Sequence, residues 1–416
     1  MKRQITIGEI AEINANSLTQ KDVFQEIMYL DTGNITRNEI DNIQVLNVVM
    51  DKIPSRAKRK VKDKTIIYST VRPNQEHYGF LENPSDNFIV STGFSTIDVY
   101  DKDTDGKFIY YLLTQKHITD YLHAIGENSV SSYPSINPDD IANLKFAVPD
   151  FKTQQSIAAV LSALDKKIAL NKQINARLEE MAKTLYDYWF VQFDFPDANG
   201  KPYKSSGGEM VFDETLKREI PKGWEVKSLG EIALTSSRGT PTSTVQEYYK
   251  GGNIPWVNSG ELNNNFIVHT DNFITQTGMD NSSAKLVSEK SILLAMYGAT
   301  AGKTSLISFK TTTNQAICSI LPKDMNYRVY IKSYLDNMYL YLVQLSSGSA
   351  RDNLSQDKIK RLHLVIPESG ILEIFSNVTE DFYKKIENNL KQNHHLTQLR
   401  DFLLPMLMNG QVSVAE

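Results

Sequence analysis

The chain has 416 residues, of which 41% are hydrophobic and 23% are charged, and its formal net charge is −4. This composition is typical of a globular protein of two to four domains, and it excludes a chain that is basic over its whole surface. Cys318 is the single cysteine, which excludes an intramolecular disulfide framework and cysteine-rich zinc sites. No apolar run approaches the roughly 18 residues of a membrane span, and MKRQITIGEI at the start lacks the apolar segment of a secretory signal. We therefore expect a cytoplasmic protein.

Residues 1–150 (module 1) have the pattern of short strands separated by turns. The runs Lys64–Thr70, Asn87–Thr92 and Asn143–Val148 read as strands, and Lys107–Ile125 has a more helical pattern. Residues 223–367 (module 2) repeat this plan, with strands expected at Ser291–Met296, Gln315–Leu321 and Arg361–Ile366. The sequence therefore predicts two similar modules of mixed helix and strand, an α+β fold.

A long helix is expected after each module, at residues 151–192 and 368–410. Apolar residues recur there at alternating three- and four-residue steps, the a and d positions of a coiled coil. The first helix would be about 60 Å long, too long to bury its seam in one small domain. Either helix alone would be read as an ordinary amphipathic core helix, but two at a constant offset favour mutual pairing. The seam residues are Ile157, Val160, Leu164, Ile174, Leu178, Met181, Leu185 and Tyr188 in the first helix, and Phe375, Val378, Phe382, Leu396, Leu399 and Leu403 in the second.

The sequence repeats itself along its whole length. Lys-Lys-Ile ends at Ile168 and again at Ile386, which gives an offset of 218 residues in the helices. Asn171 and Asn389 take the same a position, where a polar residue lowers stability but fixes the register. Lys167 and Lys385 share a d position. In the modules the offset drifts by a few residues, as when Ile7-Gly8-Glu9-Ile10 returns as Leu229-Gly230-Glu231-Ile232, so we infer a duplicated unit with diverged loops.

Residues 193–222 separate the first helix from module 2. The density of helix and strand breakers predicts an ordered loop or linker without a regular element. Residues 411–416 would form a tail. Because the chain passes through a whole module between its two helices, we expect an antiparallel coiled coil that separates the modules, with an internal pseudo-twofold repeat. The breakers are Pro196, Gly200, Pro202, Gly207, Gly208 and Pro221.

Several stretches carry a resemblance to a known family. PDANGKPYKSSGGEM (Pro196–Met210) followed by IPKGWEV (Ile220–Val226) is similar to the central linker and second-domain entry of the specificity subunits of type I restriction–modification systems (HsdS). IPWVNSGEL (Ile254–Leu262) and YGATAGKT (Tyr297–Thr304) resemble recurrent stretches of that family's recognition domains. The resemblance covers essentially the whole chain, in the family's order of module, helix, module and helix. In module 1 the counterpart of YGATAGKT, Ser69–Arg72, lacks the glycines.

The resemblance implies a protein that does no chemistry of its own. Its modules would be target-recognition domains that read the two halves of a split DNA target, with a spacer fixed by helix length. Its helices would hold two methyltransferase subunits, and restriction (motor-nuclease) subunits would add cleavage. S-adenosylmethionine would bind to the methyltransferase subunits, which flip the target adenine out of the stack, so this chain would bind no cofactor itself.

Basic residues crowd module 1 just before the strand expected at Lys64. A run of like charge is usually a solvated face, but in this duplicated architecture we expect contacts to DNA phosphates. In module 2, Arg238 lies in a polar loop that could place its guanidinium on a guanine edge, although a lone loop arginine is more often solvated. The run 263–265, three asparagines, forms a turn or reads adenine. The DNA-binding candidates are Arg56, Lys58, Arg59, Lys60, Lys62, Arg72, Arg238, Lys303 and Arg351.

The stretch GATAGKT (Gly298–Thr304) is close to a nucleotide-binding P-loop but has three residues between its glycines where the P-loop needs four. The residues after it look like a returning strand, which favours a tight turn, near DNA or purely structural, with Lys303 within reach of a phosphate.

Three further interpretations compete with DNA recognition. An autonomous enzyme would be a P-loop-like NTPase or a nuclease, and for the nuclease the sequence offers only a permissive pattern of Asp197 with Glu225 and Lys227. A structural coiled-coil scaffold without DNA affinity is the third.

Neighbouring His394 and His395 point in different directions on a helix, so no metal site is expected there.

Overall fold

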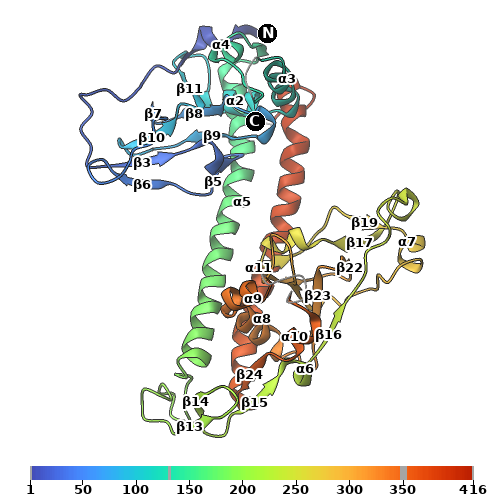
Figure 1. Cartoon of the computed structure of the whole chain (residues 1–416). Coiled ribbons are helices and arrows are strands. Elements are labelled where there is room, and N and C mark those ends of the chain that lie inside the picture. Colours follow the sequence, from blue (N-terminus) through green and yellow to red (C-terminus); the bar gives the residue numbers. More distant parts are fainter. Residues whose placement is uncertain (1, 130–132, 347–353, 415–416) are drawn as a thin grey trace. The chain divides into compact units, whose positions relative to one another are not determined.

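The structure is a computed structural model that describes residues 2–129, 133–346 and 354–414. The chain divides into two compact units (Figure 1). Unit 1 consists of Met1–Lys166 and Leu396–Glu416, and unit 2 of Lys167–His395. Each unit contains one module and a segment of both long helices, α5 (Phe151–Tyr186) and α11 (Ser369–Asn409). The predicted fold class, two similar modules of mixed helix and strand with long helices, is confirmed.

Module 1 is built on two four-stranded sheets. The first has the order β2-β11-β8-β9 and the second β6-β3-β10-β7, while β1 pairs with β12. The strands are β1 (Arg3–Thr6), β2 (Ala11–Ile13), β3 (Glu26–Leu30), β4 (Ile35–Thr36), β5 (Glu39–Ile40), β6 (Gln44–Asn47), β7 (Ala57–Lys60), β8 (Thr65–Ser69), β9 (Tyr78–Leu81), β10 (Phe88–Ser91), β11 (Phe94–Val99) and β12 (Lys145–Val148). The helices are α1 (Ile7–Ile10), η1 (Thr32–Asn34), η2 (Pro73–Gln75), α2 (Gly106–Leu113), α3 (Lys116–Glu127) and α4 (Pro138–Ala142).

Module 2 has a five-stranded sheet of order β16-β23-β20-β21-β18 and a smaller one of order β19-β17-β22. Its strands are β15 (Glu225–Ser228), β16 (Ala233–Ser237), β17 (Ile254–Val257), β18 (Phe266–Ile267), β19 (Phe273–Ile274), β20 (Ile292–Ala295), β21 (Thr304–Ile307), β22 (Thr312–Thr313), β23 (Ile317–Pro322) and β24 (His363–Ile366). Its helices are α6 (Leu229–Ile232), η4 (Gln246–Tyr248), η5 (Ser259–Asn263), α7 (Gln276–Asp280), α8 (Tyr327–Asn337), α9 (Tyr339–Ser346) and α10 (Gln356–Lys360). Cys318, on β23, is fully buried, and burial raises the pKa of its thiol to about 12.

The two modules repeat one topology. The order β2-β11-β8-β9 corresponds to β16-β23-β20-β21, and β8–β9 and β20–β21 both form antiparallel hairpins. In the second sheets, β3 pairs in parallel with β10 as β17 does with β22. Local signals repeat as well: a capping box begins α1, where Glu9 accepts from the Thr6 backbone at 2.9 Å, and another begins α6, where Glu231 accepts from Ser228 at 2.6 Å. Strand β7 is an addition at the edge of the second sheet of module 1.

The long helices run antiparallel within each unit (Figure 1). In unit 1 the start of α5 packs on the end of α11, where Ile157 and Leu161 share a core with Leu407. In unit 2 the rest of α5 packs on the start of α11, and Leu178 lies against a core that contains Ile386. Residues related by the offset of 218 therefore do not face each other.

The buried stripe of each helix differs from the predicted seam at one of its two heptad positions. Leu164, Leu178, Leu185, Phe382, Leu396 and Leu403 are half-buried, and Ile157 and Phe375 are buried. The other position lies one residue later than predicted, at Leu161, Ile168, Asn175, Ala182, Trp189, Thr379, Ile386 and Asn393, all buried. As a correction, the residues that precede this stripe are half-buried or exposed: Val160, Lys167, Ile174, Met181, Tyr188, Val378, Lys385 and Leu399. At three positions a polar or small residue lies in the stripe, namely Asn175, Ala182 and Thr379. Each follows a larger apolar residue, Ile174, Met181 or Val378, and at these positions the apolar pattern indicated the wrong register.

The segment between α5 and module 2 contains a regular element that the sequence did not indicate. After the short π-helix η3 (Asp187–Val191), strands β13 (Met210–Asp213) and β14 (Arg218–Pro221) form an antiparallel hairpin. The expectation of a linker without elements was wrong here, because prolines and glycines at the flanks of the strands were read as breaking the whole segment. Lys217, in the connecting turn, has a φ of 53°, in the left-handed region.

Candidate nucleic-acid interface

Polar and cationic side chains lie together at one end of the strands of the large sheet of module 2. The end of β16, the start of β23 and the loop between β20 and β21 all lie at this end, as the strand registers require. Arg238 directly follows β16, Gln315 precedes β23, and Lys303 closes the loop. Residues separated by up to 77 positions in the sequence are thus brought together into one candidate site, the module 2 edge.

The stretch Gly298–Thr304 forms the loop of a β-hairpin. β20 and β21 are antiparallel, and Gly298 and Gly302 have φ values of 90° and 80°, which side chains rarely adopt. A nucleotide-binding P-loop connects a strand to a helix, whereas this loop returns directly to a strand. The tight turn is therefore confirmed as the geometry of this stretch, and the P-loop alternative does not fit it.

Individual contacts set the side chains of this edge. The Nζ of Lys303 donates to Oδ1 of Asn263 at 2.5 Å, which holds the ammonium against η5. Arg238 is half-buried, and its Nε is buried without a hydrogen-bond partner in the described structure. A buried donor without a partner is costly, and because it is buried this Nε is closed to a ligand in this arrangement.

Gln315 is a residue of this edge that the sequence analysis did not single out. It is exposed, its backbone N–H donates to Oγ1 of Thr240 at 3.4 Å, and its carbonyl accepts from Ser237 at 3.3 Å. Its place at the start of an expected strand was the available signal, since strand ends meet at sheet edges. Asn265, in contrast, donates to Oε2 of Glu179 on α5 at 2.9 Å, so it braces the module and does not face this edge.

Arg72 takes the equivalent place in module 1. It lies in the loop between β8 and β9, the counterpart of the loop between β20 and β21. Its φ of 48° is left-handed, and its guanidinium lies over the ring of Tyr133, 4.6 Å from the ring centre. Backbone strain at a non-glycine residue, held by a cation–π contact, indicates a side chain whose position is fixed by its surroundings.

The basic run of module 1 lies on and around β7, the additional edge strand. Arg56 and Lys58 are exposed. Lys60 forms an ion pair with Asp22, and this hydrogen bond is the main cause that lowers the pKa of Asp22 to about 2. The two remaining members are partly engaged: Arg59 donates to Ser17 at 3.4 Å, and Nζ of Lys62 is 3.7 Å from Asp98. Arg56 and Lys58 are therefore the members best placed to meet a polyanion.

The remaining residues singled out from the sequence are Arg351, Asp197 and Glu225. Arg351 lies outside the described residues. Asp197 accepts backbone hydrogen bonds from Asn199 and Lys201, and Glu225 pairs with Lys227 at 2.8 Å, so each has a local structural role. No cluster of three or more His, Cys, Asp or Glu side chains suited to a metal is found within the described ranges. In that part of the chain, no helix combines the length and apolar character needed to cross a membrane.

Comparison with known proteins gives a consistent picture. Residues 2–180 and 221–392 match the family model described as type I restriction modification DNA specificity domain. The HindI specificity subunit of Haemophilus influenzae is 28% identical over 99% of both chains, and the MjaIX specificity subunit of Methanocaldococcus jannaschii is 27% identical over 99% of this chain and 93% of the relative. A crystal structure of the type I restriction–modification S subunit from M. genitalium has a similar fold, with a TM-score of 0.60 at 15% identity over 98% of this chain and 96% of that one.

Proposed function

Since this chain belongs to the type I restriction modification DNA specificity family, we propose that each of its modules reads one half of a split DNA target. The observation that carries the proposal is that the two modules have equivalent strand ends in their sheets, and that these ends carry different side chains. Arg238, Gln315 and Lys303 occupy this end in module 2, and Arg72 occupies the equivalent loop in module 1. Different side chains on one backbone frame would select different bases.

We expect two kinds of contact with DNA, one that provides affinity and one that selects bases. The exposed Arg56 and Lys58 on the edge of module 1 would contact phosphates, which gives affinity without sequence preference. Arg238 and Gln315 carry groups that can form paired hydrogen bonds with guanine and adenine, respectively, in the major groove.

We further propose that the chain performs no chemistry and acts through partner subunits. Two methyltransferase subunits would hold S-adenosylmethionine and modify the target adenine, and restriction subunits would add cleavage. The hairpin geometry of Gly298–Thr304 supports this, because it removes the strongest sequence signal for an autonomous NTPase. The single cysteine of the chain is compatible with the reducing cytoplasm, where we place this activity.

A groove on the helix pair of unit 2 is our candidate for docking a methyltransferase helix. It encloses about 460 Å³ and is lined mainly by apolar side chains. Met181 and Val378 on its walls are 53% and 39% exposed, an unusual environment for large apolar residues of a coiled coil. A partner helix laid in this groove would bury them and convert the helix pair into a bundle. The lining residues are Glu180, Met181, Thr184, Leu185, Tyr188, Val378 and Phe382.

Exchange of module 1 tests the proposal directly. Residues 1–150 are replaced by the corresponding module of another specificity protein, and the methylated sites of a host that carries the hybrid are sequenced. We expect one half of the target to change while the other half stays the same. Changes in both halves, or methylation at no defined sequence in the parent system, would contradict the proposal.

A further inference from the structure

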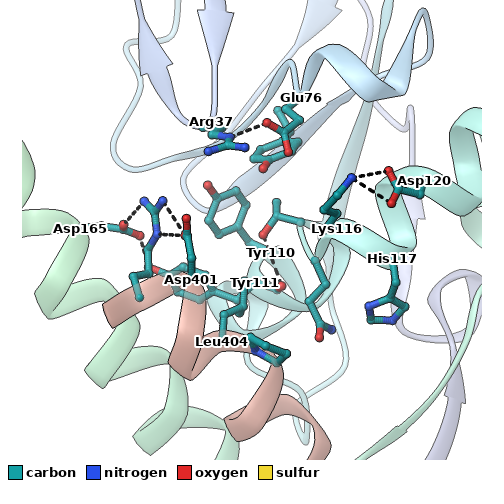
Figure 2. Close-up of a pocket in the computed structure, with 15 residues that line it drawn as sticks. Arg37, Glu76, Tyr110, Tyr111, Lys116, His117, Asp120, Asp165, Asp401 and Leu404 are labelled. Carbon is teal, nitrogen blue, oxygen red and sulfur yellow. Dashed lines mark hydrogen bonds and ion pairs between the residues drawn. The ribbon is translucent and has the colours of Figure 1, made fainter. Parts of the chain in front are cut away.

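A cavity of about 510 Å³ lies in unit 1, where the module meets the helix pair (Figure 2). Its walls come from the start of β9, α2, the beginning of α3, α5 and α11. The volume falls in the range of about 300–1,000 Å³ that is typical of small-molecule sites. The lining residues are Arg37, Glu76, Tyr78, Tyr110, Tyr111, Thr114, Gln115, Lys116, His117, Asp120, Asp165, Arg400, Asp401, Leu404 and Pro405.

The cavity follows from the repeated architecture. In unit 2 the same joint holds a cavity of about 440 Å³. Lys183, Tyr186 and Tyr383 line it, and the offset of 218 residues relates them to Asp401, Leu404 and Asp165 of the unit 1 cavity. A hollow that recurs at equivalent positions is a feature of the joint and not a local packing fault.

The charged side chains of the unit 1 cavity already satisfy one another. Arg400 donates to Asp165 at 2.9 Å and to Asp401 at 2.9 Å, and Tyr111 donates to the second oxygen of Asp165 at 2.6 Å (Figure 2). Arg37 pairs with Glu76, and Lys116 pairs with Asp120 at 2.9 Å. Three cations thus face four carboxylates, because Arg400 is shared by two of them, and no cation is left free for an anionic ligand.

The hydroxyls of two buried tyrosines are the groups that remain. Tyr78 and Tyr110 are each 5% exposed, and neither hydroxyl hydrogen-bonds to any residue that the structure describes. Their rings lie 6.2 Å apart at 73°, and burial raises the pKa of both phenols, so both stay protonated and can donate or accept. Neither hydroxyl oxygen is among the fully buried unpartnered atoms, so each opens to the cavity, where water or a ligand can bond to it.

The helix end adds an unmatched acceptor. Pro405 lies inside α11 and has no N–H, so the carbonyl of Asp401 lacks its usual helical donor. Both residues line the cavity, together with the apolar side chain of Leu404. The site therefore combines aromatic walls, one apolar wall and neutral donors and acceptors.

We propose that this cavity binds an uncharged nucleoside, with its base against Tyr78 and Tyr110. A base has a polar edge for the two tyrosine hydroxyls and a flat face for the half-exposed guanidinium of Arg37, on which bases stack readily. A nucleotide would bring phosphate charge into a site whose cations are already neutralised by carboxylates. A polyamine would face carboxylates that are likewise already paired.

Titration calorimetry of the full chain with adenosine tests the proposal. We expect saturable binding with a submillimolar Kd, and binding of AMP and of spermidine at least about tenfold weaker. Tyr110→Phe keeps the ring and removes one hydroxyl, so binding should weaken about fivefold, which corresponds to one neutral hydrogen bond of about 1 kcal/mol. Leu404→Trp places a large ring at the cavity wall and should abolish binding.

The matched control is Tyr121→Phe, because Tyr121 is 56% exposed and does not line the cavity. Its affinity for adenosine should equal that of the unmodified chain. Thermal unfolding of each variant checks its fold, and Tyr110→Phe is conservative enough to remain folded if Leu404→Trp does not. Absence of adenosine binding, tighter binding of AMP or spermidine, or unchanged affinity in Tyr110→Phe would each overturn the proposal. The measurement needs no DNA, so it stands or falls independently of DNA recognition.

Discussion

Asn171 and Asn393 are joined across the helix pair by a hydrogen bond of 2.8 Å from Nδ2 of Asn171 to Oδ1 of Asn393. A second bond of 2.8 Å joins Nδ2 of Asn389 to Oδ1 of Asn175. The offset of 218 residues relates Asn171 to Asn389 and Asn175 to Asn393, so each bond is the counterpart of the other in the internal repeat. All four side chains are buried, and polar residues in a seam favour the one register in which they meet.

Replacing one member of this pair should be costly. Asn171→Leu leaves the buried amide of Asn393 without that partner, and we expect a loss of about 1–3 kcal/mol in the free energy of unfolding. In the double variant with Asn393→Leu, the loss should be smaller than the sum of the two single losses, because neither amide is then orphaned. Urea unfolding measures the cycle. Gln173→Leu, at an exposed position, is the control and should stay near the parent value; strict additivity would contradict the coupling.

The corrected register of the helices predicts different losses of stability for substitutions at the neighbouring residues Ile386 and Lys385. Ile386 is 1% exposed, so Ile386→Ala should cost about 2–5 kcal/mol of stability through lost contacts and a cavity. Lys385 is exposed, and Lys385→Ala should change stability by no more than about 0.5 kcal/mol. Differential scanning calorimetry of the two variants distinguishes the registers, since equal losses would restore the seam that the sequence indicated.

Docking at the groove should be separable from folding. Met181→Lys places a charge at an exposed position, so the thermal unfolding of the chain should hardly change, whereas burial under a partner helix would become unfavourable. We expect the variant to lose co-elution with the methyltransferase in size-exclusion chromatography. Gln173→Lys makes a similar change on α5 outside the groove and should retain the complex. A stable complex with Met181→Lys would refute the assignment of this groove.

If Arg56 and Lys58 contact DNA phosphates, as proposed, the affinity for DNA should depend on salt concentration. Lys58→Ala should weaken binding to all DNA sequences alike and should reduce the slope of log affinity against log salt by about 1. Fluorescence anisotropy across a salt series gives this slope. Lys145→Ala removes an exposed lysine from β12, outside the basic run, and serves as the control. An unchanged slope for Lys58→Ala would place the DNA elsewhere.

The ion pair of Lys60 and Asp22 predicts a pH effect of definite sign. The hydrogen bond from Lys60 lowers the pKa of Asp22 to about 2 in the folded chain, below the value of about 3.9 of a free aspartate. The pair therefore stabilises the fold above pH ~4, and this contribution disappears as the pH falls from ~4 towards ~2. Lys60→Met should raise the pKa of Asp22, as measured by carbon NMR of its carboxyl group, while Lys62→Met should leave it near 2.

Much of the architecture could be predicted from local patterns. The strands around Ile66, Ile89 and Ile292 and the two long helices follow from periodicity, and the offset of 218 residues in the sequence indicates the duplication. The heptad register failed at one position because Asn175 and Ala182 lie in the buried stripe while Ile174 and Met181, which are more apolar, lie beside it. A pattern of hydrophobicity cannot distinguish a seam from a second apolar stripe next to it.

The candidate site was harder to predict than the fold. Charge could identify Arg238 and Lys303 but not that Gln315 shares their edge, because strand pairing sets this proximity. Within the basic run of module 1, the sequence could not separate Lys60, which is held by Asp22, from the exposed Lys58. These distinctions depend on tertiary contacts between residues that are far apart in the chain.

The burial of Cys318 has a practical consequence for spectroscopy. A thiol that is fully enclosed, with a pKa near 12, is almost entirely protonated and shielded from alkylating reagents at neutral pH. The native chain would thus remain unlabelled by maleimides, and one cysteine introduced on the surface of each module could carry a probe without further engineering. Paired dyes at such positions would follow the separation of the two modules during the search for a target.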